Sequence, residues 1–387
     1  MLPPQHFNAL LELFQKSSNM SGAQLAQLIR ELPLDLALSS ALQQAVLGDN
    51  RPLNAWLFKE GAYPNTPLVW IAPIRARNPR YVWMVGHANS TAHSVHTWFT
   101  NVRDATKADF LLRQTSISPP LLFVDPYKVS TATTREAGQE DEFAIFQTGY
   151  EKTVDEVSDL DQRMVINVQH SIAKRRQAIM RLRKVLRNND TIANLLDENI
   201  ELYAILHNEG HNQGHFVGAW PHEDVIKKNT VLYESVEEFR ACVAAVLLAE
   251  HLPLSENLKD GFALSVFMTR FFGFGFDAYG LKVQKRETAR EVTVGIFFFE
   301  FLLANKVISI EKGADTICLN IDLSRLRPAF TLAFRQLFEE ESAAERTGAG
   351  LRSIAENWYR KGFPGGEYSK SVVEVYNAII VQPKGGN

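Results

Sequence analysis

The pattern of apolar and polar positions divides the chain into three parts. Apolar residues recur at helical spacing in segments such as 23–32 and 36–47, which predicts short amphipathic helices over residues 1–60. From about residue 66 the pattern changes to short runs rich in β-branched and aromatic residues, bounded by Pro, Gly and Asn. These runs predict a small sheet over residues 66–148. Helical spacing returns after it and continues to about residue 360.

Two polar stretches could be mistaken for functional segments. STATTREAGQEDE at 130–142 has the composition of an exposed loop. KRRQAIMRLRKVLR at 174–187 is rich in basic residues, but its apolar residues lie on one face of a helix. We therefore expect a long solvated amphipathic helix over 160–187, not a nucleic-acid-binding patch.

These patterns together predict an α+β protein of two domains. Residues 1–150 form a smaller mixed α/β N-terminal domain, and residues 151–387 form a mostly helical C-terminal domain. No internal repeat is present.

Composition narrows the functional classes. The 387 residues are 45% apolar and carry a net charge of −3, so the chain can bury real cores and nucleic acid is not its expected partner. Its two cysteines, Cys242 and Cys318, fit a reducing compartment. The first residues lack a secretory pattern, and the longest apolar run, 294–304, contains Glu300 and is too short to cross a bilayer. These features predict a cytoplasmic protein without a membrane partner.

The segment LHNEGHNQGHFVGAWPHE, residues 206–223, holds four of the ten histidines. Residues four apart on a helix share one face, so His207 and His211 can direct two imidazoles at one point. Zinc peptidases with an HExxH helix obtain two ligands in this way and keep an open position for water. The spacing therefore predicts a metal site.

The expected general base is displaced in this chain. HExxH places a glutamate beside the first histidine, where this chain has Asn208. Glu209 comes one residue later, about 200° around an ideal helix from His207. It can act as the base only if the helix turn is distorted, and Gly210 could permit that distortion. His215 is a further candidate, either as a fourth ligand or as a proton shuttle.

A carboxylate from the next helix, near 233–251, would complete the site. Glu234, Glu237 and Glu238 all lie near its start. Ser235 and Glu238 also fit a capping box, which needs no metal, so the spacing alone leaves the choice open.

The segments LHNEGHNQG at 206–214 and SVEEFRACVAAVLLA at 235–249 resemble the two motif helices of the dipeptidyl-peptidase III family of zinc metallopeptidases, HExxGH and EExRA. The stretch 290–312 is similar to that family's long apolar helix and following strand. Residues 317–338 and 354–359 resemble its terminal helical pair. The resemblance covers the C-terminal half only, and the first motif is one residue shorter than in the family.

This resemblance implies a gluzincin-like site. It gives His207 and His211 as zinc ligands and Glu238 as the third ligand, with Glu237 orienting a histidine. The family also has a histidine on its later apolar helix, but this chain has none beyond His251. The resemblance therefore supports the fold and the metal site more strongly than peptide hydrolysis.

Other histidines and aromatic residues have simpler expected roles. His222 follows Trp-Pro and is expected in a loop. His87, His93 and His96 form a second group, for which we expect surface positions or a pocket lining. The aromatic segment 268–280 is expected to pack in a core.

The sequence thus predicts a zinc-dependent metallohydrolase that acts on a peptide or another small-molecule amide, with Glu209 and His215 as catalytic groups. Two alternatives stay open. Two histidines and one carboxylate also hold iron in non-heme oxygenases, and a noncatalytic metal-binding protein would need no base. The oligomeric state is not predicted.

Overall fold

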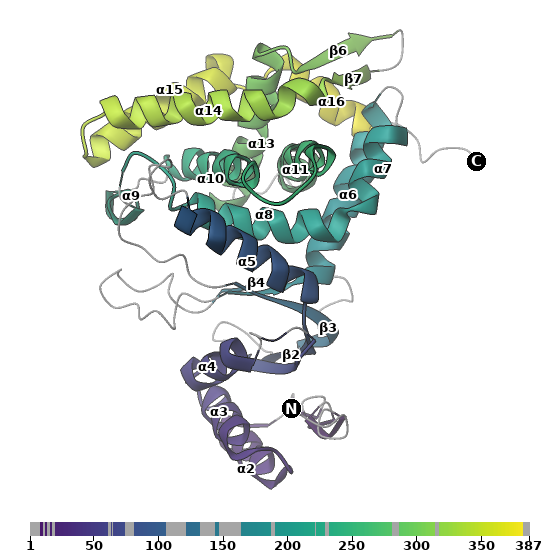
Figure 1. The fold of residues 1–387 in the computed structure, drawn as a ribbon, viewed down its shortest axis with the longest axis vertical. Helices are drawn as coiled ribbons and strands as arrows, with labels where there is room; N and C mark the ends of the chain where they lie inside the picture. Colours follow the sequence, from purple (N-terminus) through teal and green to yellow (C-terminus); the bar gives the residue numbers. More distant parts are fainter. Residues whose placement is uncertain are drawn as a thin grey trace. The chain divides into compact units, whose positions relative to one another are not determined.

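The computed structural model is mostly helical, with a five-stranded and a two-stranded sheet, so the predicted α+β class is confirmed (Figure 1). It describes residues 8–381 apart from 11, 14–15, 18–19, 61–62, 64, 74–80, 106–120, 132–143, 147–163, 187–189, 221, 229–231, 281–285 and 314–316. Among the described helices, none is long and apolar enough to cross a membrane.

The first helices form where the apolar spacing predicts them. They are α2 (Gly22–Glu31), α3 (Leu36–Val46) and α4 (Arg51–Glu60). Ser21 and Gln24 form a capping box that fixes the start of α2. The apolar faces of these helices join the strands of the sheet in one buried core.

Four strands of the five-stranded sheet lie in the predicted region, 66–148, and the fifth strand, β5, lies beyond it. Its strand order is β1-β2-β3-β5-β4, and every neighbouring pair is antiparallel except β3 and β5. The strands are β1 (Pro67–Pro73), β2 (Tyr81–Ala88), β3 (Leu121–Thr131), β4 (Ala144–Phe146) and β5 (Met164–Asn167). Most of the loop predicted over 130–142 lies outside the described residues.

The long helix predicted over 160–187 is partly wrong. Its start is strand β5, and helix α6 runs only over Val168–Val185. Met164–Asn167 is a short apolar run that pairs in parallel with β3, and periodicity cannot distinguish so short a run from a helix segment.

The chain forms two compact units. The first contains residues 1–94 and 119–171, and the second contains residues 95–118 and 172–387. Helices α5 (Ser90–Ala105) and α6 cross from one unit to the other. The boundary predicted at residue 150 lies outside the described residues and stays a prediction.

The second unit is a helical assembly around α10. Helix α10 lies between α8 and α14 and also packs on α11 and α13 (Figure 1). The elements are α7 (Asp190–Glu198), α8 (Ile200–Gly214), α9 (His222–Lys228), α10 (Glu234–Ala249), α11 (Glu256–Met268), the π-helical segment η4 (Thr269–Gly275), α12 (Phe276–Gly280), α13 (Arg286–Ala304), β6 (Ile308–Lys312), β7 (Ile317–Ile321), α14 (Leu323–Ala343), α15 (Gly348–Gly362), η5 (Pro364–Gly366) and α16 (Lys370–Val381).

The aromatic segment over 268–280 packs in the core of this unit, as predicted. Phe271 stacks on Phe299 and on Tyr376, with ring centroids 4.4 and 4.7 Å apart. The helix and strand expected over 290–312 are confirmed as α13 and β6.

Candidate metal site

Helices α8 and α10 approach each other closely because of two glycines. A Cβ added at Gly214 would lie 2.2 Å from the carbonyl oxygen of Ala241, and one at Gly210 would lie 3.0 Å from the Cβ of Ala245. Both glycines lie inside α8, which is α-helical throughout. The distorted turn expected at Gly210 is therefore absent, and the glycines serve helix packing instead.

The thiol of Cys242 lies between the two predicted metal-binding histidines. Its Sγ atom is 3.8 Å from Nε2 of His207 and 3.4 Å from Nδ1 of His211. His207 and Cys242 are buried, and His211 is half-buried. The sequence analysis predicted that the two imidazoles are directed at one point, but it did not include this sulfur atom.

The other nitrogen of His211 faces a second group of donors. Its Nε2 atom lies 3.2 Å from Oε2 of Glu238 and 3.2 Å from Nε2 of His215. Within the described residues, two sets therefore bring possible ligand atoms within 4.8 Å of one another, and they share His211. One set adds His207 and Cys242, and the other adds His215 and Glu238. The predicted trio of His207, His211 and Glu238 is divided between the two sets.

Glu237 contacts a histidine, as expected for an orienting carboxylate. Its Oε1 atom lies 3.0 Å from Nδ1 of His215. Arg240 donates from Nε to Oε2 of Glu237 at 3.0 Å and also reaches the carbonyl oxygens of Gly214 and Val217. This arginine is buried, and it connects the end of α8 to the start of α10.

Arg270, from the π-helical segment η4, reaches into the same cluster. Its Nε atom donates to Sγ of Cys242 at 3.1 Å, and one terminal nitrogen donates to Oε2 of Glu238 at 3.2 Å. That nitrogen is also 3.5 Å from Nε2 of His211. The other terminal nitrogen donates to Glu291 at 2.8 Å. A guanidinium group thus contacts members of both donor sets.

The backbone of Arg270 is enclosed by two more glycines. A Cβ at either Gly275 or Gly295 would lie 2.7 Å from the carbonyl oxygen of Arg270. Any larger residue at these positions would displace the backbone that carries this guanidinium.

The charges of the cluster follow from its burial. Burial is the main cause that lowers the pKa of His207 well below its ordinary value and that of His211 to about 4, so both imidazoles are neutral at neutral pH. Burial also raises the pKa of the Cys242 thiol to about 12. Burial acts to raise the pKa of Glu238, but His211 and Arg270 hold it well below its ordinary value.

This donor chemistry fits zinc. Neutral imidazole nitrogens, a thiolate sulfur and a carboxylate oxygen are the ligand types that zinc takes in proteins, so Cys242 would lose its proton on binding the ion. Because the histidines are already neutral, a metal ion does not compete with protons for them near neutral pH. The buried Nδ1 atom of His207 has no hydrogen-bond partner within the described residues, so its ring is not committed to an alternative network.

Glu209, the predicted base, lies on another side of α8. It is buried, and its Oε1 atom lies 3.1 Å from Nδ1 of His96 on α5 and accepts from Gln213 at 3.2 Å. Its Oε2 atom has no partner within the part of the chain that the structure describes. Because α8 has no distorted turn, the condition for Glu209 to act as a base is not met in this structure.

Two further expectations change. Ser235 does not cap α10, because the helix already begins at Glu234; its hydroxyl instead lies 3.2 Å from the hydroxyl of Tyr359. The capping-box alternative for Glu238 is therefore wrong.

His222 begins α9 and is not in a loop. His87 lies in β2, and His93 lies on α5 with an exposed side chain.

Sequence reasoning missed both Cys242 and Arg270, although the sequence carries a signal for the first. Cys242 follows Glu238 by four residues, so helical spacing alone places both on one face of α10. Arg270 is a single charge in the apolar run FMTRFFGFGF, which signals burial but does not reveal its partners.

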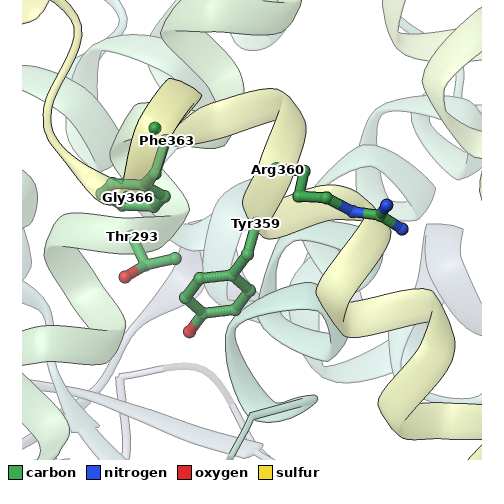
Figure 2. A pocket seen from close by; sticks show the side chains of 6 residues that line it. Thr293, Tyr359, Arg360, Phe363 and Gly366 are labelled. Carbon is green, nitrogen blue, oxygen red and sulfur yellow. The ribbon is translucent and has the colours of Figure 1, made fainter.

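A cavity of about 590 Å³ lies near the start of α10, between α13 and α15. Figure 2 shows the Tyr359 ring beside Thr293, with the Arg360 guanidinium directed away from them. The lining residues are Thr293, Tyr359, Arg360, Phe363, Gly365 and Gly366. Tyr359, which lines this cavity, contacts Ser235 on α10, three residues before Glu238.

The sequence matches no family model and no curated protein. The fold, however, is similar to the solved structure of DPP III from Caldithrix abyssi, with a TM-score of 0.63 and 12% sequence identity. The match covers 94% of this chain and 69% of that one. At this identity the likeness concerns the fold, and membership of the family stays a prediction. The chain therefore has a DPP III-like fold, and its histidine cluster lies in the helical unit.

Proposed function

We propose that this protein is a metal-dependent hydrolase that binds zinc through His207, His211 and a third donor from α10. The observation that carries the proposal is the meeting of two neutral imidazoles from α8 with a thiol and a carboxylate from α10. The DPP III-like fold supports the same chemistry.

His215 is the proposed acid–base group. When bound, the zinc ion supplies Lewis acidity toward water and toward a carbonyl oxygen. Nδ1 of His215 is held by Glu237, which leaves Nε2 on the side of the metal cluster to accept and return a proton. Arg240 fixes Glu237 and so fixes the orientation of the His215 ring.

We propose a peptide or another small-molecule amide as the substrate. Its apolar group would bind in the aromatic cavity at Tyr359, because Tyr359 contacts Ser235 on α10, the helix that carries Glu238. Nucleic acids and membranes are not among the proposed partners.

A noncatalytic metal-binding protein is the second candidate. It is favoured by the contact of Arg270 with Glu238 and by the orientation of Glu209 toward His96. Both features are unfavourable for a hydrolase whose base is the glutamate of an HExxH helix.

Elemental analysis and a screen of peptide and amide substrates test these candidates. We expect near-stoichiometric zinc in wild type and loss of zinc in His211→Ala. We also expect His215→Gln to keep zinc and lose hydrolysis by about 100-fold or more, because it removes the proton acceptor. The exposed His251, changed to Gln, serves as the matched control and should alter neither property.

The outcomes separate the candidates. Zinc without hydrolysis of any substrate would favour the noncatalytic protein. Iron in place of zinc would favour the oxygenase alternative. Absence of metal even after zinc or iron is added back would refute the proposed function.

A further inference from the structure

We propose that Arg270 decides which donor completes the metal site. It holds Glu238 away from the ion, so that Cys242 is the third ligand beside His207 and His211. This inference rests on the proposed zinc binding and goes beyond it by assigning the third ligand and a positioning residue.

Both oxygens of Glu238 face arginines. Oε2 accepts from Arg270 at 3.2 Å, and Oε1 lies 3.7 Å from Arg290. Arg270 is itself held by Glu291 and is almost completely buried. A glutamate that turned toward a metal would take one of two carboxylate partners from a buried guanidinium, which is unfavourable.

The guanidinium also disfavours the second donor set. One of its terminal nitrogens lies 3.2 Å from Glu238 and 3.5 Å from Nε2 of His211, so a positive charge already lies beside that set. A cation bound there would compete with this nitrogen for Oε2 of Glu238 and Nε2 of His211.

The guanidinium also contacts the first donor set, but there its Nε atom donates to Sγ of Cys242 at 3.1 Å, a hydrogen bond that favours the thiolate form that binds zinc. Nε2 of His207, Nδ1 of His211 and Sγ of Cys242 lie within 4.8 Å of one another, and two nitrogens with one sulfur are a zinc ligand set. An ion bound to these atoms leaves the pair of Arg270 and Glu238 in place. Arg270 is therefore a positioning residue that acts through Glu238.

Zinc affinity, measured by competition with a chelator, tests this assignment through a double-mutant cycle. We expect Cys242→Ser to weaken zinc binding by about 100-fold and Glu238→Gln to change it by less than about 3-fold. In an Arg270→Gln background Glu238 is released, so Glu238→Gln should then weaken binding by about 10-fold or more. Arg327→Gln, which removes a partly buried arginine paired with Glu250, Glu256 and Asp260, is the control.

Cobalt substitution gives a readout that does not depend on activity. The cobalt-loaded wild type should show the near-ultraviolet absorption of a thiolate ligand. That band should be lost in Cys242→Ser and kept in Glu238→Gln.

The failures of the two proposals are distinguishable. If Glu238→Gln weakens zinc binding as much as His211→Ala and the cobalt protein lacks the thiolate band, this inference is overturned while zinc binding stands. If wild type binds no zinc, the proposed function fails and the inference fails with it. If Arg270→Gln does not fold, as judged by circular dichroism, the Cys242 and Glu238 single variants and the cobalt band decide the question.

Discussion

At the scale of single residues, the role of each side chain depends on the face of α8 that carries it. His207 and His211 share the face toward α10 because they are four residues apart, so this part of the site could be predicted from local spacing. Glu209 lies on another face and contacts His96, more than one hundred positions earlier in the chain. Such a partner is set by tertiary packing, and no local pattern identifies it.

The position of Glu209 leads to a prediction at this scale. Glu209→Gln should leave the zinc content and any hydrolysis unchanged, because the side chain contacts His96 and Gln213 and not the donor sets. It should lower the free energy of unfolding by about 1 kcal/mol, because a hydrogen bond to a charged group is weakened. Urea unfolding and elemental analysis check both statements. Loss of hydrolysis with zinc retained would instead identify Glu209 as the base.

At the scale of helices and strands, the elements with strong periodicity formed where they were predicted, as α2 and α3 show. Strand β5 was missed because four residues are too few for periodicity to identify, and its pairing with β3 is distant in sequence. The π-helical form of η4 was also not predictable from spacing. Arg270 lies in this segment, so spacing predicts neither the form of the element nor the site residue that it carries.

The close approach of α8 and α10 predicts a graded effect of adding one methyl group. Gly214→Ala should lower the free energy of unfolding most, by roughly 3 kcal/mol, because its Cβ would lie 2.2 Å from a backbone oxygen. Gly210→Ala should have a smaller effect, since its nearest atoms, at 3.0 Å, belong to side chains.

The matched control for this series is Gly273→Ala. Its Cβ would meet the nearest atom of Ala178 at 3.5 Å, an ordinary contact. Urea unfolding followed by circular dichroism measures all three variants. Equal losses at Gly214 and Gly273 would show that helix propensity, and not the spacing of α8 and α10, governs the effect.

At the scale of the whole molecule, the two units allow zinc binding to be located by calorimetry. All donors of the cluster belong to the unit that contains residues 172–387. Zinc at about 100 times its Kd should stabilise that unit by about 2.7 kcal/mol, which corresponds to a rise in Tm of roughly 5–10 °C.

The transition of the other unit should not move. His207→Ala should abolish the shift and a chelator should reverse it. A zinc-induced shift that persists in His207→Ala would mean that the ion binds elsewhere.

The two glycines around the Arg270 carbonyl affect the site, although neither offers a donor atom to it. Gly275 and Gly295 offer no side chain to any ligand, yet each leaves just enough space for the backbone of Arg270. A methyl group at either position would move the backbone that carries the Arg270 guanidinium, and the hydrogen bond from Arg270 to Glu238 would then be lost. The proposed metal site is consequently sensitive to changes that alter neither a donor residue nor a charge, and a comparison of donor residues alone would not detect them.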